Sequence, residues 1–221
     1  MAIASNNAAS AQEQQDTASE TSTLRQRERV GSFGVFGSRL RGQAQHDQAW
    51  RTGDADQFVA AELEQRTADD HLLWMHDRAR PHTVHATVDH IAIGPGGITV
   101  IDSKNLCGKI RVSNAGGMFG PRMDTLQVNS RDHTALVATV QQQVEAIRDL
   151  LAMRGLPHID VSGALCLSNG AGLPMFRQLR VRGVLIDDTK AVANLAARSG
   201  ALNSETVAVA HAHLASAFPS V

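Results

Sequence analysis

The residues best suited to chemistry lie in one segment, which reads Thr87-Val-Asp-His-Ile-Ala-Ile-Gly-Pro-Gly-Gly-Ile-Thr-Val-Ile-Asp-Ser-Lys104. The run Gly94-Pro95-Gly96-Gly97 between two β-branched stretches is typical of a hairpin turn. A turn centred between Pro95 and Gly96 sets Asp89 directly opposite Asp102, and such cross-strand partners point to the same face of a sheet. Lys104 lies two residues beyond Asp102, so the alternation of a strand places it on that face as well.

Two like charges placed opposite each other destabilise a sheet, so this pair needs a counter-charge. Lys104 supplies one positive charge, and a divalent cation would supply the rest. Carboxylate oxygens are hard ligands that suit Mg²⁺ or Mn²⁺. The pattern therefore favours a metal site at Asp89 and Asp102. Two alternatives remain open: a register that slips by one residue, or two aspartates that simply end their strands in solvent.

Two predicted helices carry polar residues that face the same way as their apolar stripes. The first runs from Asp54 to about Arg66, and Asp56 lies on its buried side. The second runs from about Asp132 to Met153, with Gln143 at the edge of its stripe and Gln142 pointing away. Because a buried polar group needs a partner, we predict that Asp56 and Gln143 face a polar site under the sheet. For Asp56, the alternative is an early-turn carboxylate that the helix dipole stabilises.

The remaining elements complete an α/β fold, with a mixed β-sheet flanked by α-helices. The predicted strand Lys109–Val112 should continue the sheet. Gly116, Gly117 and Gly120 then mark a loop or a weak hairpin. Two helices, at about Thr189–Ala197 and Ser204–Ala217, close the chain, and they either cover the sheet or form a homodimer interface. Asp187-Asp188-Thr189 is the capping region of the first. The predicted strands are Leu72–His76, Val84–Ile93, Gly97–Asp102, Lys109–Val112, Val161–Leu167 and Leu179–Ile186.

The N-terminal part differs in composition from the rest. Residues 1–22 are mostly Ala, Ser, Asn, Gln and Thr without periodicity, which is typical of a disordered tail. We therefore expect a flexible, partly disordered arm over 1–48 and a single domain over 49–221, with the motifs in 49–155 and the remaining strands and covering helices in 156–221. Between residues 21 and 51, six arginines stand against Glu28 and Asp47. This stretch would either contact phosphate or remain a plain solvated segment.

Composition narrows the class of protein. The net charge of −1 does not by itself predict a nucleic-acid partner, and no run of apolar residues is long enough for a membrane span. The first residues do not resemble a secretory signal. The two cysteines, Cys107 and Cys166, are far apart, so we expect reduced thiols in a cytoplasmic protein. The histidine pairs at 82 and 85 and at 211 and 213 lack further ligands and are interpreted as structural.

The segments that carry these residues resemble the nuclease-related domain (NERD) family. They are Leu73-Trp-Met-His-Asp-Arg, Val88-Asp-His-Ile-Ala-Ile-Gly-Pro-Gly-Gly-Ile, Val100-Ile-Asp-Ser-Lys-Asn and Gly108-Lys-Ile, within a resemblance that runs from about Trp50 to Leu151. The resemblance implies the restriction-endonuclease-like core of the PD-(D/E)xK superfamily. One position departs from the family, which usually has Gly-Glu on the first helix where this chain has Ala55-Asp56.

The same resemblance implies roles for individual residues. Asp89 and Asp102 would bind the metal together with the carbonyl of Ser103, and Lys104 would orient or activate the attacking water. Gln143 matches a helix glutamine near that site. His90 alternates to the other face of the sheet, so we interpret it as structural or hydrogen-bonding.

The predicted function is therefore a metal-dependent nuclease that uses Mg²⁺ or Mn²⁺ to hydrolyse DNA. The sequence does not distinguish RNA from DNA as the substrate. Two alternatives keep the fold without catalysis: a nucleic-acid-binding module and a protein-interaction domain.

Overall fold

The computed structural model describes residues 55–81, 86–115, 123–170, 172–174 and 177–221, all within one compact unit, Ala49–Val221. The predicted arm over 1–48, with its tail at 1–22 and its arginine-rich stretch, lies outside the described residues. Gly116, Gly117, Gly120, His82 and His85 lie outside them too.

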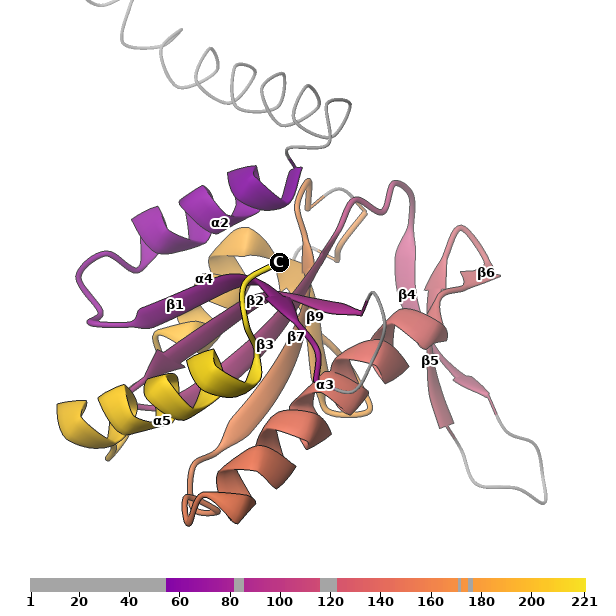
Figure 1. Cartoon of the computed structure of the whole chain (residues 1–221). Helices are drawn as coiled ribbons and strands as arrows, with labels where there is room; N and C mark the ends of the chain where they lie inside the picture. Colours follow the sequence, from indigo (N-terminus) through magenta and orange to yellow (C-terminus); the bar gives the residue numbers. More distant parts are fainter. Residues whose placement is uncertain (1–54, 82–85, 116–122, 171, 175–176) are drawn as a thin grey trace, which may run out of the picture. The chain divides into compact units, whose positions relative to one another are not determined.

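A six-stranded mixed sheet forms the centre of this unit, in the order β1-β2-β3-β7-β9-β8 (Figure 1). The first three strands pair antiparallel, β3 with β7 and β7 with β9 pair parallel, and β8 pairs antiparallel with β9. This mixture confirms the predicted α/β class and is consistent with a restriction-endonuclease-like fold. The strands are β1 (Leu73–Ala79), β2 (Thr87–Gly94), β3 (Gly97–Lys104), β7 (Val161–Leu167), β8 (Leu179–Val181) and β9 (Val184–Asp188).

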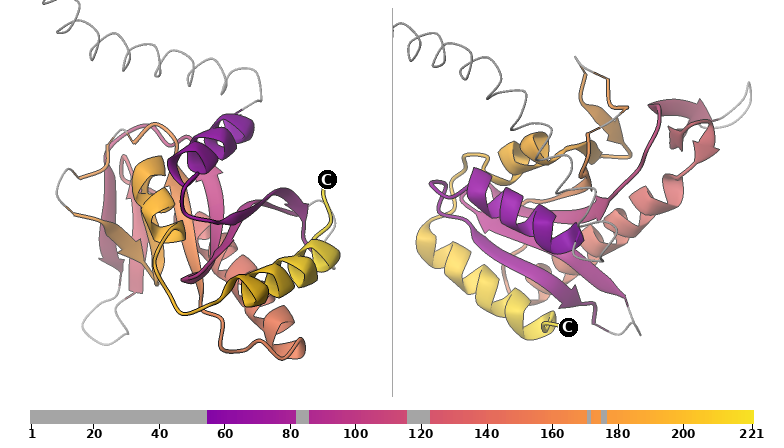
Figure 2. Two further views of the ribbon diagram at one scale, coloured as in Figure 1. Left: turned by 90° about the vertical axis from the view of Figure 1, so that its left-hand side faces the viewer. Right: turned by 90° about the horizontal axis from the view of Figure 1, so that it is seen from above.

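Helices cover both faces of the sheet (Figure 2). On one face, α3 (Thr134–Met153) and α5 (Ser204–Ala217) pack over the larger apolar core. On the other face, α2 (Ala55–Arg66) and α4 (Thr189–Ala196) pack over a smaller one. Strand residues alternate between the two cores as the two-residue period of a strand requires. No helix among the residues described here has the length and apolarity needed to cross a bilayer.

The cap predicted for the helix after β9 is confirmed. Asp188 accepts a hydrogen bond from the backbone N–H of Ala191 (2.8 Å), which satisfies one of the free donors at the start of α4. The closing helix α5 follows, as predicted, and packs against β1 and β2. Both cysteines are free thiols.

The prediction of one strand over Leu179–Ile186 is wrong. Arg182 and Gly183 both adopt positive φ, at 50° and 84°, and this turn reverses the chain. Two strands, β8 and β9, therefore pair with each other. Positive φ at both central residues is the hairpin geometry that glycine makes easy.

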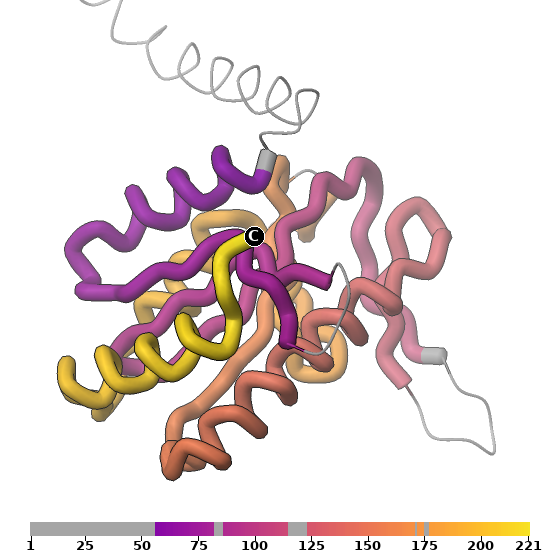
Figure 3. Tube along the Cα trace, viewed as in Figure 1, coloured from indigo at the N-terminus to yellow at the C-terminus, as the bar shows by residue number. Residues whose placement is uncertain are grey.

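The prediction that Lys109–Val112 continues the main sheet is also wrong. After β3 the chain leaves the main sheet, as the tube in Figure 3 shows, and forms a second, three-stranded sheet. Its strands are β4 (Ile110–Ala115), β5 (Met123–Val128) and β6 (Arg131–Asp132). The last two were not predicted, because their polar and half-buried residues give no clear alternation. Ile110, Leu126 and Val128 anchor this small sheet in the larger core.

Candidate active site

The β2–β3 hairpin has the predicted register. Gly94 pairs with Gly97, and the ladder runs to the pair His90–Ile101, so Asp89 and Asp102 are the next residues on their strands. The backbone N–H of Ser103 donates to Asp89 Oδ2 (2.8 Å). The Asp102 side chain is 7% exposed and that of Asp89 14%. The two alternatives, a slipped register and two aspartates in solvent, are therefore wrong.

The Lys104 side chain returns to both aspartates. Its Nζ lies 2.7 Å from Asp102 Oδ1, 2.8 Å from the carbonyl oxygen of Ser103 and 3.4 Å from Asp89 Oδ2. One ammonium group thus contacts three oxygens from two neighbouring strands. These oxygens belong to the same three residues that the sequence analysis assigned to a metal ion.

Burial and the neighbouring charges shift the pKa values of Asp102 and Lys104. Burial raises the pKa of Asp102 to about 7, and the hydrogen bond and negative charge of Asp89 add to the shift, while Lys104 opposes it. For Lys104 itself, burial disfavours the ammonium, but the negative charges of Asp102 and Asp89 outweigh this and raise its pKa. The site is therefore short of positive charge even with Lys104 in place.

Asp56 lies at the first turn of α2 and is half-buried. Burial raises its pKa, and the negative charge of Asp89 raises it further, while Lys104 lowers it. The charges of Asp89 and Lys104 therefore act on the Asp56 carboxylate. Across the described ranges, however, no three His, Cys, Asp or Glu side chains come together as a metal-binding group. A metal here would rest on two carboxylates and a main-chain carbonyl.

Gln143 lies on the buried face of α3, with 1% of the residue exposed, whereas Gln142 is exposed. The predicted helical phase is thus confirmed. The Gln143 Nε2 donates to the carbonyl oxygen of Thr87 (3.0 Å), two residues before Asp89 on β2. Its Oε1 is buried without a hydrogen-bond partner in the described part of the chain. Gln143 therefore contacts the strand that carries Asp89, with one acceptor left for a further group.

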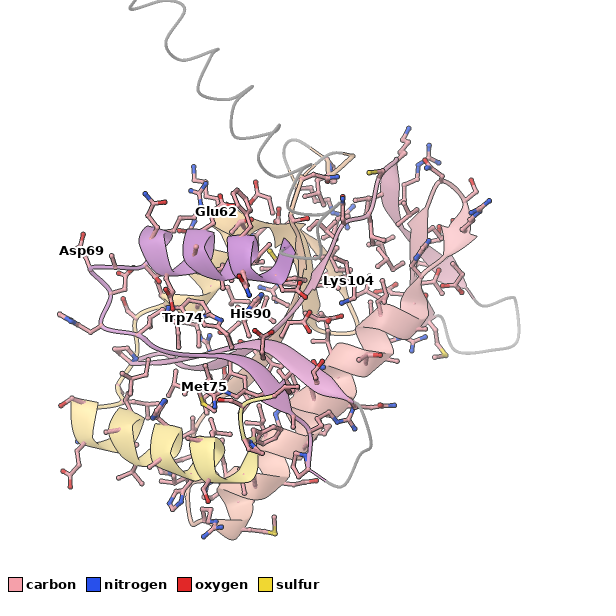
Figure 4. The ribbon with its side chains drawn as sticks, turned by 45° about the horizontal axis from the view of Figure 1, so that its top comes forward. Glu62, Asp69, Trp74, Met75, His90 and Lys104 are labelled. Atoms are coloured by element: carbon pink, nitrogen blue, oxygen red, sulfur yellow. The ribbon has the colours of Figure 1, made fainter. Side chains whose placement is uncertain are left out.

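On the face of the sheet opposite Asp89 and Asp102, side chains from α2, β1, β2 and β3 form a series of hydrogen bonds. His90 is completely buried, as its predicted hydrogen-bonding role requires, and its Nε2 lies 2.9 Å from Ser103 Oγ. Its Nδ1 lies 2.9 Å from Nδ1 of His76, whose Nε2 lies 3.0 Å from Glu64 Oε1. Figure 4 shows His90 and Trp74 on the α2 side of the sheet and Met75 on the other side. His76 and Glu64 were not predicted from the sequence. The β1–β2 register, which sets His76 opposite His90, is the signal that identifies His76.

A pocket of about 450 Å³ begins one residue beyond Lys104. Asn105 and Cys107 line it from the end of β3, and Asn129, Arg131 and His133 line it from the second sheet and the residue before α3. Among the described residues that line it, none is acidic. The pocket therefore presents the Arg131 guanidinium and the amide groups of Asn105 and Asn129 near the end of β3.

The sequence of the chain is similar to a known protein family. The model of the nuclease-related domain (NERD) matches residues 51–168, which is more than half of the chain and includes the β2–β3 hairpin, the second sheet and α3. A search of curated proteins and a search of solved structures each found no match. The matched region contains the hairpin, the helix α2 that precedes it and four of the six strands of the mixed sheet, β1, β2, β3 and β7. This chain belongs to the nuclease-related domain family.

Proposed function

We propose that this protein is a metal-dependent nuclease that hydrolyses phosphodiester bonds of DNA, with Mg²⁺ or Mn²⁺ held at Asp89, Asp102 and the carbonyl of Ser103. The observation that carries the proposal is the set of three oxygens around Lys104 Nζ, at 2.7, 2.8 and 3.4 Å. Oxygens that converge on one ammonium group have the chemistry and spacing to share a cation.

The donor set fits a divalent ion of this kind. Mg²⁺ in proteins is commonly held by one or two carboxylates and keeps several waters and substrate phosphate oxygens as its other ligands. Two carboxylates and one carbonyl therefore suffice, although no third acidic side chain from the described residues joins them. When bound, such an ion polarises a phosphoryl oxygen and lowers the pKa of its water.

The residues of the chain supply the rest of the chemistry. Asp102 holds its proton more tightly than an ordinary aspartate, since burial raises its pKa to about 7, and it would release that proton when a cation binds. The Lys104 side chain is 34% exposed, so its ammonium can leave Ser103 and move toward solvent and substrate. There it would orient the attacking water or stabilise negative charge that develops on the phosphoryl oxygens. Asp56 and Gln143 would support the site from α2 and α3.

A nucleic acid fits the surroundings of this site. The pocket beyond Lys104 presents Arg131 and the amides of Asn105 and Asn129. Lys109 and Arg111 are exposed next to β4 and on it. Phosphate groups are bound mainly by such cationic and amide side chains. We propose that the strand next to the scissile phosphate lies along this pocket. A homodimer through the closing helices remains a separate prediction.

One observation favours a second candidate, a nucleic-acid-binding module without catalysis. The Lys104 ammonium already bridges both aspartates, and Asp56 stands where the family usually has the longer glutamate. A chain that had lost its metal could keep this ion-pair cluster as a structural feature. Metal binding distinguishes the two candidates.

The test is nicking of supercoiled plasmid by the full-length chain with Mg²⁺, with Mn²⁺ and with chelator, followed by single-stranded DNA and RNA substrates. We expect nicking only with a divalent ion, and loss of at least 100-fold in Asp102→Asn, the scale of removing one essential electrostatic contact. Asp149→Asn, an exposed carboxylate on α3, serves as the matched control and should nick like the parent. Nicking in chelator, or an Asp102→Asn variant as active as the parent, would reject the proposal.

A further inference from the structure

Four side chains form a continuous hydrogen-bonded series from the surface to the catalytic strand. It runs from Glu64 through His76 and His90 to Ser103 Oγ, with contacts of 3.0, 2.9 and 2.9 Å. Glu64 at one end is 54% exposed, whereas His90 and Ser103 at the other are buried. We call these four residues the Glu64–Ser103 series.

The Glu64 carboxylate, together with a single proton on each imidazole ring, assigns a direction to every bond in the series. A carboxylate can only accept, so His76 donates through Nε2–H to Glu64. With one proton on each ring, His76 then accepts at Nδ1 and His90 donates through Nδ1–H. His90 is completely buried and contacts His76 with one ring nitrogen and Ser103 with the other. Its Nε2 therefore accepts from the Ser103 hydroxyl.

Neighbouring rings fix the position of His76. Trp74 stacks on it, with ring centroids 5.6 Å apart and planes 13° from parallel. The Trp74 indole N–H donates to Thr67 Oγ1 (3.2 Å), which in turn donates to the carbonyl of Leu63 on α2 (2.9 Å). His76 and His90 meet edge to face with centroids 5.0 Å apart. The series is thus held between α2 and the sheet.

The inner end of the series is Ser103, whose backbone contacts both Asp89 and Lys104. The Ser103 N–H donates to Asp89 Oδ2 (2.8 Å), and its carbonyl accepts from Lys104 Nζ (2.8 Å). The Ser103 hydroxyl, held by His90, lies on the opposite face of the strand. A change in the backbone conformation of Ser103 would therefore displace Asp89 and Lys104 together.

We propose that Glu64, His76 and His90 are positioning residues: they hold Ser103 by its hydroxyl, and Ser103 holds Asp89 and Lys104 by its peptide groups. The catalytic consequence rests on the proposed function, but the directed hydrogen bonds do not. The competing interpretation is a pair of core histidines that merely satisfy each other.

The first experiment needs no activity. Nitrogen NMR of histidine-labelled, metal-free, full-length protein should find His90 protonated at Nδ1 and His76 at Nε2. Glu64→Ala removes the fixed acceptor, so both rings should then populate mixed tautomers. Glu62→Ala is the matched control, since Glu62 lies on the same helix but pairs with Arg66 (2.7 Å), and it should change neither ring. His90 protonated at Nε2 in the parent, or tautomers that ignore Glu64→Ala, would overturn the proposal.

The second experiment connects the series to catalysis. Ser103→Ala keeps both peptide groups and removes only the hydroxyl, and His76→Gln breaks the series farther out. Each should weaken Mn²⁺ binding, measured by calorimetry, by about 10- to 100-fold and lower kcat, the usual effect of losing a group that orients a ligand. Because both act through one series, the double variant should lose little more than the worse single variant.

Two results of the second experiment would count against the proposal. Fully additive losses, or a lower melting temperature with unchanged Mn²⁺ affinity and kcat, would mean that the series is only structural. If the parent neither binds Mn²⁺ nor cleaves, the proposed nuclease function fails, and the NMR result still decides whether the directed series exists.

Discussion

The charge of Asp102 should make stability depend on pH in a way that one substitution removes. Its pKa rises from an ordinary 3.8 to about 7 in the folded protein, chiefly through burial. Below pH 3.8 the carboxyl is protonated in both states and costs nothing. Between pH 3.8 and about 7, Asp102 keeps its proton in the folded protein but loses it in the unfolded chain. The free energy of unfolding therefore falls as the pH rises to about 7. Three pKa units at ~1.4 kcal/mol each set a ceiling of about 4 kcal/mol.

The parent curve alone does not isolate this effect. Burial lowers the pKa of His90 from 6.5 to about 4, so that residue makes stability rise with pH over much of the same range. The useful quantity is the difference between parent and Asp102→Asn, because His90 is common to both. The unfolding free energy of Asp102→Asn minus that of the parent should increase by up to about 4 kcal/mol as the pH rises from 4 to 7.

The measurement is urea unfolding in chelator at half-unit steps from pH 4 to 7.5, with Asp149→Asn as the control that should follow the parent. Saturating Mn²⁺ should remove the difference in slope, because the ion keeps Asp102 ionised. At 100 times its dissociation constant, it should also stabilise the parent by about 2.7 kcal/mol and leave Asp102→Asn unchanged. A pH-independent difference between the two proteins, or one of opposite sign, would refute the reasoning.

Three further predictions concern single side chains. Lys104→Met should bind Mn²⁺ at least as tightly as the parent, because no ammonium then competes for the three oxygens, yet fail to nick plasmid; calorimetry and the nicking assay decide. Arg131→Ala should weaken DNA binding and lower the slope of log affinity against log salt by about one, whereas exposed Arg154→Ala should leave that slope unchanged. Gln143→Ala should lower the nicking rate and Gln142→Ala should not, and equal effects would contradict a role for the buried face of α3.

The sequence alone determined the features that depend on neighbours along the chain. Turn chemistry at residues 94–97 fixes the register of the β2–β3 hairpin, and with it the shared face of Asp89, Asp102 and Lys104. The helical period fixes which side of α3 carries Gln143. These preferences act over a few residues, so they can be deduced without knowing what packs against the segment.

Other features depend on residues that meet only in the folded chain. The second sheet and the split of residues 179–186 into a hairpin were mispredicted, because strand pairing is a choice among distant partners. His76 reaches His90 only through the β1–β2 pairing, and Glu64 reaches His76 only because α2 packs on that face. The raised pKa of Asp102 has the same origin: β7, paired with β3 from some sixty residues later in the chain, helps to bury it. Local patterns therefore name the acidic pair, whereas tertiary packing decides its charge and what holds it in place.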